Sequence, residues 1–209
     1  MYIIKQQEER LNPKYILADL NKHFYDFEKI HHEKLIQLFM KSFDSLIYGR
    51  NSDGANLSQL TLNGARDLNK QMLVIYRNSQ NIPPQFYPSN DYPTPWPNST
   101  SVRELQEYLD KRLMLRNPET GFISQCVLTP DVKFIIPRFY SSLRQTCAKK
   151  VNKKMLGWIK EQQPGKFDKG EKPTSNVFLA DFIDIRDSNF SKIVIDLNMK
   201  IVFKEKCDK

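Results

Sequence analysis

Lysine side chains gather in residues 149–170, KKVNKKMLGWIKEQQPGKFDKG, which hold seven of them. A lysine that contacts a phosphate releases a condensed counterion, so such a cluster can bind a polyanion. On an ideal helix five of these lysines fall within roughly 140° of the circumference, and Trp158 falls on the opposite, apolar side. We therefore expect Trp158 in the core and a nucleic-acid-binding face made of Lys149, Lys150, Lys153, Lys154 and Lys160.

A basic face is also the ordinary solvated side of an amphipathic helix, and that alternative stays open. Residues 138–172 hold ten basic and three acidic residues, a balance of +7 against +8 for the whole chain. An acidic protein or a membrane surface would suit the same charge, although the core-like apolar side argues against insertion into a membrane. No helix-turn-helix, zinc-finger or RNA-recognition signature surrounds these residues.

A second candidate for binding is the proline- and aromatic-rich segment 82–97, IPPQFYPSNDYPTPWP, which its prolines must keep extended. Extended proline-rich chain loses little entropy on docking, which favours a partner-binding element. The aromatic rings of this strap would carry the contact: Phe86, Tyr87, Tyr92 and Trp96. The alternative of equal weight is a strap packed across its own domain and held by the same rings.

Signatures of catalysis are missing, because GxSxG, GxGxxG and GxxxxGK do not occur. His31 and His32, with His23 nearby, form the one candidate cluster for metal or acid–base chemistry. Adjacent histidines diverge by about 100° on a helix and do not share one ion. We therefore expect no metal, no cofactor and no catalytic residue. An enzyme whose site assembles from distant residues is the alternative.

The composition favours a folded intracellular protein. The chain has 209 residues, 40% of them hydrophobic, and a sequence pI near 9.3. Three scattered cysteines without a CxxC pair indicate reduced thiols, and the N-terminal residues lack the apolar stretch of a secretory signal. No run reaches the length of a membrane span. A reducing compartment is predicted, and the basic charge favours the nucleus.

Apolar periodicity predicts an α+β fold, mainly helical, with a C-terminal antiparallel β-hairpin. Two helices, or one kinked helix, are expected over about 13–48. Further helices are expected over 57–76, 101–115 and 138–162, and a strand over 122–128. The alternation in residues 192–203 predicts the second strand of a hairpin over 176–204. The predicted division is an N-terminal helical region (1–80), the strap (81–98) and a second helical region (99–209).

These patterns together predict a non-catalytic accessory subunit of a larger intracellular complex. It would bind other subunits through the strap and the hairpin edge, and DNA or RNA through the basic helix. A pure scaffold without nucleic-acid contact and the small-molecule enzyme are the alternatives.

Overall fold

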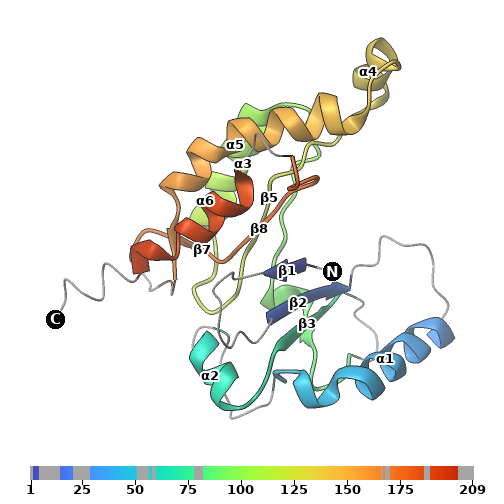
Figure 1. Ribbon diagram of the computed structural model, residues 1–209, viewed down its shortest axis with the longest axis vertical. Coiled ribbons are helices and arrows are strands. Elements are labelled where there is room, and N and C mark those ends of the chain that lie inside the picture. The colour runs from blue at the N-terminus through green and yellow to red at the C-terminus, as the bar shows by residue number, and fades with distance from the viewer. Residues whose placement is uncertain are drawn as a thin grey trace. The chain divides into compact units, whose positions relative to one another are not determined.

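A computed structural model describes residues 2–4, 15–20, 29–50, 57, 60–77, 82–165, 167, 170–185 and 189–201. The chain forms two compact units, Met1–Tyr92 and Pro93–Lys209, so the border between them falls inside the proline-rich strap. Figure 1 shows both units as mixtures of helices and strands. The predicted mixture of α and β structure is confirmed.

The first unit is built on a four-stranded sheet of order β1-β2-β3-β4. β1 (Tyr2–Ile4) runs antiparallel to β2 (Tyr15–Leu20), whereas β3 (Met72–Tyr76) is parallel to β2 and to β4 (Tyr87–Pro88). Two parallel neighbours need a crossover connection. That connection carries α1 (Lys29–Phe43), the 3-10 turn η1 (Asp44–Leu46) and α2 (Leu62–Asp67).

The core of this unit lies between β3 and α1. β3 reads MLVIY and is buried almost throughout, which is typical of a strand in a parallel sheet with both faces covered. α1 presents Ile36, Phe39, Met40 and Phe43 to it at helical spacing. The aromatic ring of Phe86 packs between them, 6.4 Å from that of Phe39 and 6.0 Å from that of Tyr76.

The second unit combines helices with two short parallel strand pairs. α3 (Val102–Met114) leads to β5 (Ile123–Gln125), then to α4 (Val132–Ile135) and the 3-10 turn η5 (Ile136–Arg138). A π-helical turn, η6 (Arg144–Ala148), opens into α5 (Lys149–Glu161). β8 (Val177–Leu179) returns parallel to β5, β6 (Gln163–Pro164) pairs in parallel with β7 (Thr174–Ser175), and α6 (Phe190–Asp196) follows.

Three helices of the second unit share one hydrophobic core. Ser101 caps α3 by accepting from the Glu104 N–H, and one face of α3 is buried, as the predicted helix over 101–115 requires. α5 contributes Val151, Met155 and Ile159 to the same core, and α6 closes it. The expected helix over 138–162 is confirmed from Arg144 onward, and the expected strand over 122–128 is confirmed as β5.

Two predicted helices were wrong at one end each. Residues 15–20, placed in a helix over 13–48, form β2, and residues 72–76, placed in a helix over 57–76, form β3. Short apolar runs such as YILADL and MLVIY have no periodicity that separates a buried strand from a buried helix. The pairing of β2 with β3 decides these cases, and it is a long-range contact.

The predicted C-terminal hairpin over 176–204 was also wrong. β8 is a strand, but its partner is β5 in parallel, and the following residues form α6. The segment has helical as well as alternating spacing: Phe190, Ile193, Val194 and Leu197 lie on one side and pack against the α5 core. Lys192 and Asp196, 2.6 Å apart, form an i,i+4 ion pair that only a helix permits.

Candidate functional site

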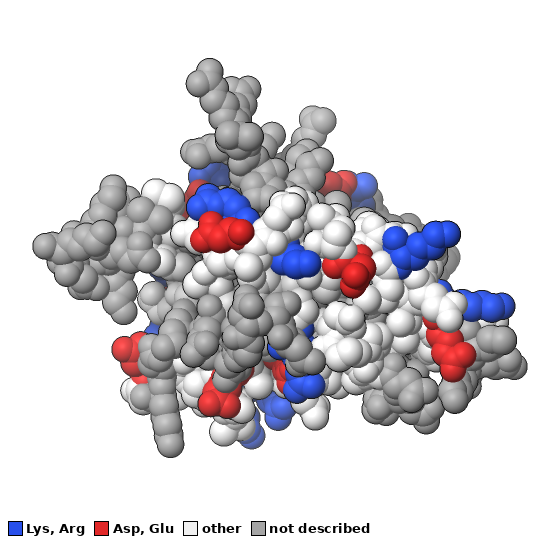
Figure 2. Space-filling view, turned by 90° about the horizontal axis from the view of Figure 1, so that it is seen from below, with Lys and Arg blue, Asp and Glu red and all other residues white. Residues whose placement is uncertain are grey.

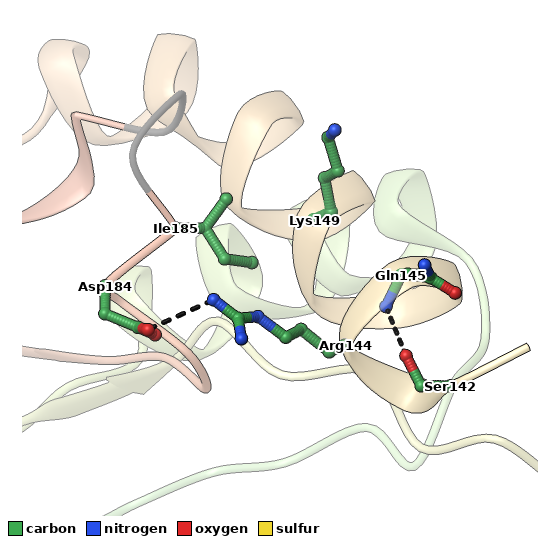
Figure 3. A pocket seen from close by; sticks show the side chains of 6 residues that line it. All are labelled: Ser142, Arg144, Gln145, Lys149, Asp184 and Ile185. Carbon is green, nitrogen blue, oxygen red and sulfur yellow. Dashed lines mark hydrogen bonds and ion pairs between the residues drawn. The ribbon is translucent and has the colours of Figure 1, made fainter.

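A pocket of about 610 Å³ in the second unit lies where the start of α5 meets the segment after β8 (Figure 3). Four of its lining residues come from the helical entry to α5 and two from the β8 side. They are Ser142, Arg144, Gln145, Lys149, Asp184 and Ile185. Asp184 and Ile185 follow the carboxyl end of β8, the strand that pairs in parallel with β5.

The π-helical turn η6 positions the helical side of the pocket. The backbone N–H of Lys149 donates to the Arg144 carbonyl, five residues back, so one turn is wider than in an α-helix. Such turns occur frequently at functional sites. Ser142 fixes the entry, since its hydroxyl oxygen accepts from the Gln145 N–H at 3.3 Å (Figure 3).

A buried amide positions the other side. Asn152 on α5 is fully buried, and its Nδ2 donates to the carbonyl oxygens of Asp181 (2.9 Å) and Phe182 (3.3 Å). Phe182 has φ of 51°, a left-handed conformation that is costly for a bulky residue and persists only where its surroundings enforce it. These bonds hold the turn that delivers Asp184 to the pocket.

The charged side chains of the pocket suit a ligand that combines an anionic group with hydroxyl groups. Arg144 and Lys149 are cations, and Asp184 is a hydrogen-bond acceptor. Arg144 Nη2 lies 3.1 Å from Asp184 Oδ2, and both side chains are more than half exposed, so solvent screens the pair. Arg144 also lies over the Phe182 ring, 5.8 Å from its centroid. A guanidinium with an ammonium close by is the chemistry that holds a phosphate, while a carboxylate accepts from hydroxyl groups.

Two ionisable groups near these strands have raised pKa values. Burial raises the pKa of the Cys126 thiol, which directly follows β5, and a neutral buried thiol is a poor nucleophile. Partial desolvation raises the pKa of the Asp181 carboxyl at the end of β8. Within the described ranges no three His, Cys, Asp or Glu residues could jointly hold a metal ion.

The predicted basic face is present on α5. All five of its lysines are exposed, and only Lys149 lines the pocket. Trp158 is buried opposite them, as predicted, and its indole N–H donates to Asp110 Oδ1 at 2.7 Å. On the face drawn in Figure 2, basic and acidic side chains lie interspersed.

The four predicted partner-binding rings have different surroundings. Phe86 and Tyr87 are buried in the first unit and so are not available to a partner, which supports the packing alternative for them. Tyr92 is half-buried, and its carbonyl accepts from Arg77 at 3.1 Å. Trp96 is 40% exposed. A partner contact through Tyr92 and Trp96 stays a prediction.

The structure gives no support to a shared role for the histidines. His23 lies outside the described residues, and His32 points to the first core, where its Nδ1 is 2.5 Å from the Tyr76 hydroxyl.

The pocket was not predicted from the sequence, which singled out only Lys149 among the residues that line it. The remaining signal was weak, because Ser142 and Gln145 are common polar residues and Asp184 lay in the expected hairpin.

In sequence, the chain is similar to several PI-PLC X domain-containing proteins. It is 33% identical over 193 residues to PI-PLC X domain-containing protein 3 of Mus musculus, covering 91% of this chain and 55% of that protein. The human protein of the same name is 32% identical over 186 residues (88% and 54%), and mouse PI-PLC X domain-containing protein 2 is 30% identical over 189 residues (88% and 51%). The chain spans about half the length of the curated relatives it matches.

Neither a family model nor a solved structure matches the chain. The relatives contradict the expected non-catalytic, nucleic-acid-binding subunit of a complex and the expectation that the chain is not an enzyme, because their names refer to a phospholipase-type domain. Of the alternatives, an enzyme with a site assembled from distant residues agrees better with this finding. Among the described helices, none is long and apolar enough to cross a bilayer.

Proposed function

We propose that this chain forms part of a phospholipase-C-like enzyme that cleaves the phosphodiester of phosphoinositide lipids. Identity of about 30% to several PI-PLC X domain-containing proteins, along roughly nine tenths of the chain, is the observation that carries the proposal. A reaction of this class releases the phosphorylated headgroup into water and leaves diacylglycerol in the membrane.

The pocket beside α5 supports the proposal through its chemistry. A phosphoinositide headgroup combines phosphate with a ring of hydroxyl groups. Arg144 and Lys149 would bind the anionic part, and Asp184 would accept from hydroxyl groups.

Within this chain the proposed role is to bind and orient the headgroup. The residues named above would hold the phosphate in place and balance its charge. Lys149 and Arg144 are the members whose removal should matter most, because each would place a positive charge beside the phosphate; at this exposed site such a contact contributes up to about 1 kcal/mol.

The first prediction concerns this pocket. Replacing Arg144 and Lys149 together by glutamine should weaken binding of a soluble inositol phosphate by about tenfold or more. The Kd is measured by titration calorimetry, and headgroup release from phosphoinositide vesicles by mass spectrometry.

The matched control is Lys153→Gln with Lys154→Gln, which removes the same charge from the same helix outside the pocket. This pair should leave the Kd within about twofold, because exposed charges at a distance are largely screened by salt. Equal losses for both pairs would show that only the overall charge of α5 matters and would remove the pocket from the proposal.

A further inference from the structure

The segment between β5 and α5 carries an apolar surface that is exposed to solvent. Phe139 is 84% and Tyr140 80% exposed, the largest values among the exposed apolar side chains of the described chain. Figure 1 shows α4 and its connections projecting beyond the N-terminal end of α5 within the second unit. We call this surface the apolar tip; its members are Val132, Ile135, Ile136, Phe139, Tyr140 and Leu143.

The tip is ordered by local contacts and not by burial of these side chains. Asp131 caps α4 by accepting from the Phe134 N–H at 2.8 Å. Arg138 donates to the Phe134 carbonyl at 2.9 Å and lies over the Phe134 ring at 4.1 Å. The Phe139 and Tyr140 rings meet edge to face at 5.6 Å. A built turn therefore presents its largest apolar groups outward.

Six exposed apolar side chains within residues 132–143 favour an interaction site, because monomeric proteins seldom leave large apolar patches in water. The types of side chain in the tip indicate what it binds. Phenylalanine and tyrosine beside aliphatic residues suit the boundary between lipid headgroups and acyl chains.

The charge around the tip also favours a lipid surface, and in particular an anionic one. Residues 131–150 hold five basic residues and one acidic residue, and that acid, Asp131, is occupied as the α4 cap. Lys133 and Arg138 lie within the tip itself, and Lys149 and Lys150 follow on α5. Basic residues next to inserted apolar groups bind anionic lipid headgroups and hold the apolar groups at the membrane surface.

We propose that the apolar tip is an interfacial anchor that inserts Phe139 and Tyr140 into the surface of an anionic membrane. The inference deepens the proposed function and rests on it in one respect: a pocket that takes lipid headgroups needs a device that holds the protein at the lipid surface. The pocket residue Arg144 follows Leu143 directly, so the anchor and the pocket belong to one continuous stretch of chain.

The second prediction tests the anchor by vesicle sedimentation. Phe139→Ser with Tyr140→Ser should weaken partitioning onto vesicles of phosphatidylcholine with phosphatidylserine by at least about tenfold. The variant lacks the two aromatic side chains whose transfer from water to the membrane would favour binding. Lys133→Gln with Arg138→Gln should weaken it by about fivefold per charge on these vesicles and hardly at all on pure phosphatidylcholine.

Matched controls come from α3 and its end. Met114→Ser with Leu115→Ser removes two apolar side chains that are each 69% exposed, and Lys111→Gln with Arg112→Gln removes two exposed charges. Both controls should keep wild-type partitioning. The thermal unfolding midpoint of the Phe139→Ser, Tyr140→Ser variant should match that of the wild type, since both side chains are at least 80% exposed.

The outcomes separate this inference from the proposed function. Vesicle binding that depends on the tip supports the anchor, even if no headgroup is released. Tip variants that bind vesicles as the wild type does would overturn it, even if hydrolysis occurs. A lowered unfolding midpoint would assign the tip to a contact within the chain, and a dimer in ultracentrifugation that the tip variants dissociate would assign it to a second copy; either result also overturns the anchor.

Discussion

At the scale of single residues, the second unit depends on a few polar groups that are bonded inside apolar surroundings. Trp158 fills the core and places its N–H against Asp110, while Asn152 uses its amide to fix the turn after β8. The sequence revealed the first of these, because helical spacing alone put Trp158 opposite the lysines. It did not reveal the second, because an asparagine inside the lysine-rich run KKVNKK looks like part of the solvated face.

The third prediction concerns the Trp158–Asp110 bond. Trp158→Ala should lower the free energy of unfolding by about 3–5 kcal/mol, because a large buried side chain is removed. Trp158→Phe and Asp110→Ala should each cost about 1 kcal/mol, and the double variant less than their sum, since one hydrogen bond is lost in both. Urea titration gives the values; additive losses would show that the bond has no energetic weight.

The fourth prediction concerns Asp181, whose pKa is raised in the folded state by partial desolvation. Below its ordinary pKa the carboxyl is protonated in both states, so burial has no ionic cost. As pH rises from that ordinary value through the raised one, the unfolded state loses its proton first and stability falls. Asp181→Asn should therefore flatten the pH dependence of the urea midpoint above about pH 4, the ordinary pKa of an aspartate, and raise the midpoint at neutral pH. Parallel curves for the two proteins would contradict this assignment.

At the scale of elements, sequence periodicity located structure wherever one period was dominant. α3 and α5 have clear amphipathic patterns, and β5 lies inside a short β-rich run, so α3 and β5 were predicted close to their observed bounds and α5 close to its C-terminal end. β2, β3 and α6 were not, because their residues satisfy two patterns at once. Long-range packing decides between the patterns: β2 pairs with β3 across about fifty residues, and α6 docks on α5.

The fifth prediction separates helix from strand over residues 190–201. Ile195 in α6 is 40% exposed and Leu197, which caps the helix, is buried, whereas one strand face would hold both. Leu197→Ala should cost about 2–5 kcal/mol of unfolding free energy and Ile195→Ala less than about 1 kcal/mol. Similar losses in urea titration would favour the strand arrangement.

At the scale of the whole molecule, net charge was the property that misdirected the functional prediction. A chain with a formal charge of +8 attracts any polyanion, and the long-range field of its lysines does not distinguish DNA from an anionic lipid surface. Discrimination comes from short-range features: a pocket joined from residues about forty positions apart, and an apolar tip that no spacing rule reveals. Similarity to PI-PLC X domain-containing proteins supports the lipid alternative.

The most direct measurement of the central claim is headgroup release from mixed vesicles that contain phosphatidylinositol and phosphatidylcholine together. Both lipids are presented on one surface, so anchoring is identical for the two and only recognition and cleavage differ. The proposed function predicts release of phosphorylated inositol with an equal amount of diacylglycerol, little phosphocholine, and loss of the reaction in Arg144→Gln with Lys149→Gln. Absence of headgroup release while the protein is bound to the vesicles, or equal cleavage of both lipids, would contradict the proposed function.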